Sequence, residues 1–127
     1  MATGAPGRYH LRMDPKSKDD VLVVLTTVAN LEEAKSLAHA VVEKGNAACV
    51  NILPEIRSIY SWEGRICDDP EVLLVIKTNR RAFAALSNTI GELHSYDVPE
   101  IVALPTDAVD PRYAAWLSSA VQNQPRP

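Results

Sequence analysis

Two long apolar segments joined by a tight turn constrain the fold of this chain more than any other feature. The first segment begins at Ala47, the second ends at Thr78, and Glu63-Gly64 lies midway between them. A two-residue turn of this kind needs positive φ, which glycine adopts without steric cost. The region therefore predicts a long β-hairpin in which alternate residues share a face.

Proline residues predict irregularities in both arms of this hairpin. Pro54 lies in the first arm, and Asp68-Asp69-Pro70 lies in the second. Proline lacks the N–H group that a strand ladder uses, so we expect a bend or a β-bulge in each arm. Between them, Ile56, Tyr60 and Trp62 would share one face. The predicted ribbon is long, bent and apolar.

The residues before the hairpin predict a strand followed by a helix. Val21 to Val28 is an almost continuous apolar run, which is typical of a strand covered on both faces. Asn30 is a suitable N-cap, and Glu33 follows it at the spacing of a capping box. Apolar residues then repeat at helical spacing until Gly45, which is a suitable C-terminal stop.

The residues after the hairpin predict a helix, a short strand and a last helix. Asn79 is a candidate N-cap, and Gly91 inside the first of these helices suggests close packing there. The apolar stripe of that helix consists of Phe83, Leu86, Ile90 and Leu93. Residues 94–99 form a loop, Glu100 to Leu104 form the strand, and Asp110-Pro111 begins the last helix.

This order of elements is β-α-β-β-α-β with an added C-terminal helix, which is the ferredoxin-like arrangement of the α+β class. Right-handed crossovers place both main helices on one face of a four-stranded antiparallel sheet. The hairpin arms are about twice as long as ordinary strands of about 5–6 residues. Because an unpaired apolar overhang promotes aggregation unless another chain covers it, we expect an obligate oligomer.

Length and composition indicate one domain in a chain of 127 residues. We predict a disordered N-terminal extension at 1–20, the folded domain at 21–121 and a frayed tail at 122–127. The net charge of −3 predicts no nucleic-acid or membrane partner, and no apolar run has the roughly 20 residues of a membrane span. Two cysteines, without an apolar leader segment, indicate the cytoplasm.

Four motifs follow one another along the chain: Ala48-Cys49-Val50-Asn51, Ser58-Ile59-Tyr60-Ser61-Trp62-Glu63-Gly64, Lys77-Thr78 and His94-Ser95-Tyr96-Asp97-Val98-Pro99-Glu100-Ile101. Together they resemble the CutA divalent-cation-tolerance family. The similarity covers residues 21–121. It implies a ferredoxin-like homotrimer in which each hairpin completes a neighbour's sheet. It also implies metal tolerance through binding of copper or other divalent cations and, in animals, anchoring or processing of acetylcholinesterase.

The candidate metal ligands are Cys49, His94 and Glu100. A thiolate is a soft ligand that suits Cu(I), but a cysteine in an apolar strand is also a common buried residue. His94 is either a ligand or a residue that caps a helix C-terminus. Bacterial relatives with a proposed copper site use a strand cysteine and a second histidine, and the corresponding positions here are Thr26 and Leu93.

A second candidate site is a cleft between subunits, formed by Tyr60, Trp62, Lys77 and Tyr96. Burial at a subunit interface is the simpler explanation of the first two residues. Lys77 either extends its charged end to water or pairs with Glu100 at this cleft, because a buried charge needs a partner.

Three classes of function follow from these residues. The first is a homotrimer that binds soft divalent metal ions. The second is a signalling or scaffold trimer, similar to the PII regulators, with a small ligand or a protein in the intersubunit cleft. The third, an enzyme, is not expected. The segment Thr26-Thr27-Val28-Ala29-Asn30 has neither the glycine-rich loop nor the arginine of ferredoxin-like acylphosphatases, and fold alone implies no activity.

Overall fold

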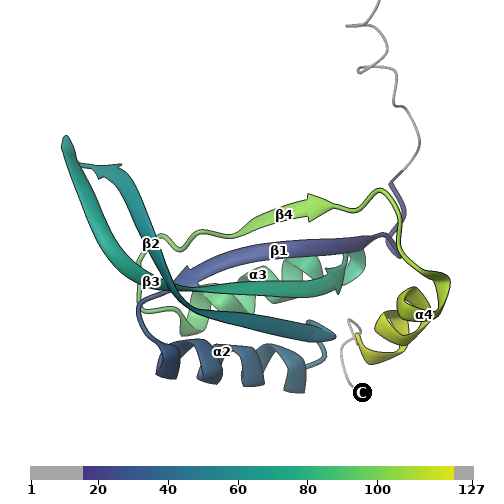
Figure 1. The fold of residues 1–127 in the computed structure, drawn as a ribbon. Coiled ribbons are helices and arrows are strands. Elements are labelled where there is room, and N and C mark those ends of the chain that lie inside the picture. The colour runs from purple at the N-terminus through teal and green to yellow at the C-terminus, as the bar shows by residue number, and fades with distance from the viewer. Residues whose placement is uncertain (1–15, 122–127) are drawn as a thin grey trace, which may run out of the picture.

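The structure is a computed structural model, and it describes residues 16–121. Its elements are β1 (Val21–Val28), α2 (Leu31–Glu43), β2 (Cys49–Trp62), β3 (Arg65–Asn79), the 3-10 helix η1 (Arg80–Ala82), α3 (Phe83–Leu93), β4 (Val102–Pro105) and α4 (Pro111–Ala120). The strands form one antiparallel sheet in the order β2-β3-β1-β4. Helices α2 and α3 lie on one side of it, and α4 lies beside one end (Figure 1). The predicted ferredoxin-like α+β fold is confirmed.

The core lies between the sheet and helices α2 and α3. Its fully buried members include Val24, Val28, Leu74, Ile76, Val41, Leu86 and Ile90. Even-numbered residues of β1 and β3 point into this core, as the strand period of two requires. The prediction that Leu93 belongs to the buried stripe of this helix is wrong. Leu93 is the last residue of α3, and its side chain is 49% exposed.

Both predicted asparagine caps are present. Asn30 Oδ1 accepts a hydrogen bond from the Glu33 N–H at 2.8 Å. Asn79 Oδ1 accepts one from the Ala82 N–H at 3.0 Å and so caps η1, which continues directly into α3. The capping box is not completed, because the Glu33 carboxylate accepts hydrogen bonds from Ser95 instead of turning back to Asn30. This redirected carboxylate joins α2 to the loop that follows α3.

The hairpin turn and the first bulge match the prediction. Glu63 and Gly64 have φ values of 50° and 78°, as a type I′ turn requires. The ladder shifts register between Leu53 and Ile56, on either side of Pro54. The irregularity predicted in the second arm is wrong, because residues 68–70 pair in register with β2. Residue 70 lies beyond the part of β3 that pairs with β1, so its missing N–H removes no hydrogen bond on that side.

Part of the predicted N-terminal extension contacts the domain. Residues 16–20 form a turn, and the backbone N–H groups of Arg80 and Arg81 donate to carbonyl oxygens of this turn at 2.9 Å each. These five residues therefore belong with the folded part of the chain. The rest of the predicted extension, 1–15, and the predicted tail, 122–127, lie outside the described residues.

Gly91 has room for a side chain, so the close packing expected there is wrong. No described atom lies within 4 Å of a Cβ built on it, apart from its neighbours in the helix. We expect Gly91→Ala to raise the free energy of unfolding by about 0.5–1 kcal/mol, because alanine favours the helix and restricts the unfolded chain. Urea denaturation measures this. Gly64→Ala is the control and should lower stability, because alanine disfavours positive φ; a destabilised Gly91→Ala would contradict the helical packing described above.

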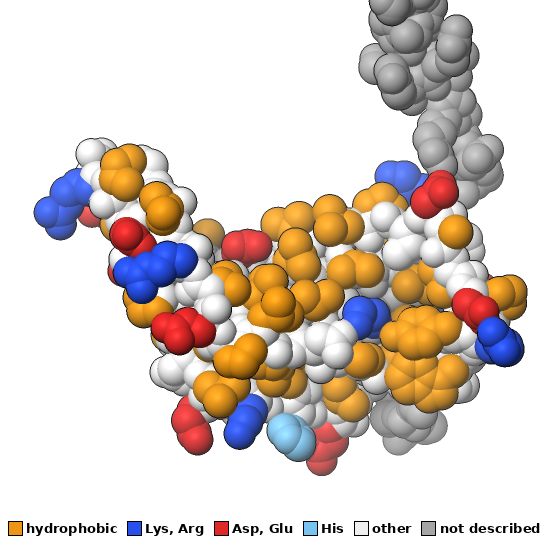
Figure 2. Space-filling view, in the orientation of Figure 1, with side chains coloured by type: hydrophobic (Ala, Val, Ile, Leu, Met, Phe, Trp, Pro, Cys, Tyr) orange, Lys and Arg blue, Asp and Glu red, His pale blue; other side chains and the backbone are white. Residues whose placement is uncertain are grey.

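The second face of the sheet is apolar, and α2 and α3 leave it uncovered. We define this open face by Val23, Leu25, Leu53, Leu73, Val75, Lys77, Val102 and Leu104, which pair across the four strands on one side of the sheet. Figure 2 shows hydrophobic side chains gathered over the strands. Leu53, Val102 and Leu104 are each more than 40% exposed. In one chain, therefore, β1 is covered on only one of the two faces for which its sequence is suited.

Candidate functional site

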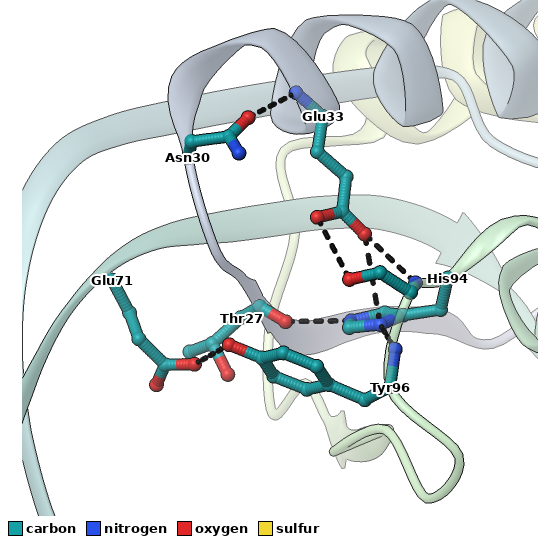
Figure 3. Close-up of polar contacts among 7 residues, drawn as sticks. Thr27, Asn30, Glu33, Glu71, His94 and Tyr96 are labelled. Carbon is teal, nitrogen blue, oxygen red and sulfur yellow. Dashed lines mark hydrogen bonds and ion pairs between the residues drawn. The ribbon is translucent and has the colours of Figure 1, made fainter.

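His94 is a fully buried residue at the end of α3 (Figure 3). Its Nε2 lies 2.7 Å from the Thr27 carbonyl oxygen, and its Nδ1 accepts a hydrogen bond from the Tyr96 N–H at 3.0 Å. Because Nδ1 is an acceptor, we assign the proton to Nε2, which donates to Thr27. Both ring nitrogens are therefore engaged within the chain.

Glu33 links the first turn of α2 to the loop after α3 (Figure 3). Its carboxylate accepts hydrogen bonds from the Ser95 N–H at 3.0 Å and from the Ser95 hydroxyl at 3.1 Å, and it lies 3.7 Å from His94 Nδ1. The hydroxyl contact depends on serine at position 95, and the N–H contact requires a residue other than proline there, since a proline has no N–H to donate. The loop after α3 is thus fixed at two consecutive residues.

Tyr96 extends this network to β3. Its hydroxyl donates to Glu71 Oε2 at 2.6 Å, and Glu71 is only 8% exposed (Figure 3). Burial and the neighbouring Glu71 carboxylate both raise the pKa of Tyr96 well above its usual value, because they disfavour the phenolate. Tyr96 therefore remains a neutral hydrogen-bond donor at any ordinary pH.

A cleft of about 760 Å³ opens between the outer part of the hairpin and this loop. Its lining comprises Thr27, Arg57, Ser58, Ile59, Tyr60, Trp62, Glu71, Tyr96, Asp97, Val98 and Glu100. Of the predicted cleft residues, Tyr60, Trp62 and Tyr96 come together here. Lys77 does not line it and instead donates from Nζ to Asn51 Oδ1 on the open face.

The three predicted metal ligands do not meet within one chain. Cys49 pairs with Lys77 at the start of β2, whereas Glu100 lines the cleft beside Glu71. Lys77 lies six positions after Glu71 on β3, which corresponds to roughly 20 Å of extended strand. Between residues 16 and 121, no group of three His, Cys, Asp or Glu side chains is placed to hold a metal ion. His94 could bind a metal only after one of its ring nitrogens gave up its present partner.

The same fold occurs in known proteins. A family model described as "CutA1 divalent ion tolerance protein" matches residues 22–120 of this chain. This chain belongs to the CutA1 family. The match confirms the resemblance seen in the sequence motifs.

Two relatives illustrate the extent of the similarity to CutA proteins. The divalent-cation tolerance protein CutA of Thermus thermophilus is 48% identical over 95 residues, which cover 75% of this chain and 92% of that protein. The chloroplastic CutA of Arabidopsis thaliana is 42% identical over 114 residues, which cover 89% of this chain and 63% of the relative. The chain thus spans about three fifths of the plant protein. These relatives are named tolerance proteins or simply CutA, and neither name refers to an enzymatic activity.

Solved CutA structures share the fold. The Thermus thermophilus protein superposes with a TM-score of 0.79 at 45% identity, covering 80% of this chain and 99% of that one. CutA1 of Oryza sativa superposes with a TM-score of 0.80 at 41% identity, covering 83% of this chain and 96% of that one. A further structure, from Archaeoglobus fulgidus, is described as periplasmic. The predicted cytoplasmic location therefore differs from the compartments named for two relatives. Within residues 16–121, no helix is long and apolar enough to cross a membrane.

Sequence reasoning missed two carboxylates of the candidate site, Glu33 and Glu71. Glu33 stood at a capping-box position, which explains its side chain without any distant contact. Glu71 stands at the start of the apolar run that ends at Thr78, where an exposed charge is also common. The one available signal was a charged residue at the edge of an apolar run, where burial requires a partner.

Tyr60, on the hairpin wall of the cleft, provides a pH-dependent test. Its hydroxyl donates to Asp69 Oδ2 at 2.6 Å, and this contact raises the pKa of Tyr60 from 10.0 to about 12. Between these values the unfolded chain loses the proton and the folded chain keeps it. The contact therefore stabilises the fold fully below pH 10, and this stabilisation is lost as the pH rises toward 12. Ultraviolet titration should show Asp69→Asn returning the pKa toward 10; an unchanged pKa would contradict the contact.

Proposed function

We propose that this CutA1-family protein is a homotrimer that binds divalent metal ions and thereby contributes to metal tolerance. The observation that carries the assembly is the open face, an apolar sheet surface without a covering helix. Apolar patches of this extent on soluble proteins usually mark interaction sites, because burying them is favourable. A neighbouring copy would also cover the exposed hairpin residues Ile59 and Ile66, which are 68% and 77% exposed.

The hairpin overhang favours head-to-tail assembly. Residues 65–71 of β3 do not pair with β1, and β4 has one free edge at the outside of the sheet. An overhang from one copy can therefore pair with a free edge of the next. Such heterologous contacts form a closed ring when the rotation between copies permits it. Three copies is the number that the family resemblance implies.

The metal ligands would then come from more than one copy. Cys49 supplies a thiol and Glu100 a carboxylate at separate parts of one chain, and both are at least partly exposed. His94 contributes less in this proposal, because both of its ring nitrogens are engaged. The names of the relatives support the relevance of divalent cations, while the thiol favours copper among them.

Native mass spectra recorded with Cu(I), Cu(II) and Zn(II) would test this metal proposal. We expect a trimer that takes up about one copper ion per chain, with uptake reduced at least tenfold by Cys49→Ser. Cys67→Ser is the matched control, since Cys67 is the other free and partly exposed thiol. A trimer that takes up no ion, or a Cys49→Ser variant that binds as well as the unmodified chain, would contradict metal binding at this thiol.

A second candidate function is small-ligand binding without a metal ion, and the cleft beneath the hairpin favours it. Its volume lies in the range of about 300–1,000 Å³ that is usual for small-molecule sites. In either case we infer a binding protein of the cytoplasm and not an enzyme.

A further inference from the structure

The cleft is lined by the hairpin and by the segment after α3. Tyr60 and Trp62 come from the hairpin, while Asp97 and Glu100 belong to the segment after α3. Glu71, which accepts a hydrogen bond from Tyr96, is the most buried carboxylate of the lining. In the proposed trimer the hairpin offers its strand edges to a neighbour, whereas these side chains stand on its face. The cleft is therefore a separate surface from the edges that would pair.

The charges in the cleft are mainly negative. Glu71, Asp97 and Glu100 line it together with a single basic residue, Arg57. Arg57 Nε lies 2.9 Å from Asp68 Oδ1, so this guanidinium already has an acidic partner. A concave surface with this excess of carboxylates attracts a cation and repels an anion. Phosphate-bearing ligands are therefore disfavoured.

Glu71 is the most deeply placed of these carboxylates. It is 8% exposed, and Oε2 accepts the Tyr96 hydroxyl, but no residue of the described chain donates to Oε1. Figure 3 shows this second oxygen directed away from Tyr96. A buried carboxylate gains most from a partner that carries positive charge, because such a partner offsets its desolvation.

Aromatic rings complete the site. Trp62, Tyr60 and Tyr96 are 57%, 43% and 37% exposed, so part of each ring is available to a ligand. The negative face of an aromatic ring attracts organic cations, and tryptophan does so most strongly. Val98 adds apolar surface to the same lining.

We propose that this cleft binds a small organic cation that carries an ammonium group on an apolar body. The ammonium group would lie against Glu71 Oε1, and the apolar body would lie between Trp62 and Val98. Among residues 16–121, the cleft carboxylates form no group of three placed around one metal ion. A ligand several ångströms long reaches them better than a bare ion does. This inference rests on the small-ligand binding proposed above for this cleft and names its ligand class, and it does not depend on the metal binding.

Phenethylammonium is a suitable probe, and Trp62 is a suitable reporter. The chain has two tryptophans, so a Trp116→Phe background leaves Trp62 as the only one. We expect phenethylammonium to change the Trp62 fluorescence with a dissociation constant on the order of 1 mM. Glu71→Gln should weaken binding about tenfold or more, because the amide keeps an oxygen for Tyr96 but removes the charge. Glu43→Gln, on the exposed end of α2, is the matched control and should change nothing.

Probes of the same shape but different charge decide the outcome. Hydrocinnamate, an anion, should not bind, and the neutral phenethyl alcohol should bind about tenfold more weakly. Equal binding of all three, no binding of the ammonium probe, or unchanged binding in Glu71→Gln would overturn the proposal. A fluorescence change with Zn(II) alone that depends on Glu71 would assign the cleft to a metal ion and would also overturn it. A native mass spectrum of the same sample reports separately on the trimer.

Discussion

Val75→Glu should convert the assembled protein into single chains. Val75 lies near the middle of the open face, where it pairs with Leu25 on β1 and with Asn51 on β2. A carboxylate there would have to be removed from water in any assembly that covers this face, and this desolvation costs several kcal/mol. Native mass spectrometry should therefore report the single-chain mass of 13.9 kDa for this variant.

Val42→Glu is the matched control for this experiment. Val42 lies on α2 and is 42% exposed, so the same change of side chain occurs far from the open face. We expect this variant to keep the assembly and to change the free energy of unfolding by no more than about 0.5 kcal/mol. An unchanged assembly in Val75→Glu would show that the open face is not the interface.

His94→Ala should lower the free energy of unfolding by about 2–4 kcal/mol. The substitution leaves the Thr27 carbonyl and the Tyr96 N–H without their partner, and it opens a cavity at a fully buried position. We also expect faster hydrogen exchange in residues 95–99, since His94 anchors the start of that loop. Urea denaturation at fixed protein concentration measures the first effect, because the stability of an oligomer depends on concentration.

His39→Ala provides the same substitution at an exposed position of α2. It should change the free energy of unfolding by no more than about 0.5 kcal/mol. If His94→Ala lost less than about 1 kcal/mol, or if exchange in residues 95–99 stayed unchanged, the buried network around His94 would not be holding the loop.

Local chemistry in the sequence predicted most of the fold. The hairpin turn at Glu63-Gly64 and the caps at Asn30 and Asn79 depend on a few adjacent residues, so the sequence alone is enough to predict them. The expectations that failed depended on contacts with residues that are distant in the sequence. Gly91 faces open space, and residues 68–70 lie beyond the end of β1 pairing.

The candidate site was only partly predictable for the same reason. Tyr60, Trp62 and Tyr96 belong to motifs that the fold brings together, and the sequence named them. Glu33 and Glu71 gain their roles only through contacts with the loop after α3, at separations of 62 and 25 residues. The candidate ligands Cys49, His94 and Glu100 share a suitable residue type, but residue type does not predict how far apart they lie in the fold.

The apolar composition of β1 indicates a strand that is covered on both faces. Within a single chain only one face of β1 is covered. Covering the other face requires another molecule, so a mismatch between sequence and single-chain structure is here informative about assembly. Lys77, paired with Asn51 on this face, is the charged residue that such an assembly would have to accommodate.

The most direct test of the central claim is the mass of the unmodified protein in a native mass spectrum recorded over a range of dilutions. Burial of the open face in a homotrimer predicts a species of three chains that persists on dilution. A single-chain species of 13.9 kDa that remains folded and soluble at all concentrations would contradict the account, because the open face would then be stable in water without a partner.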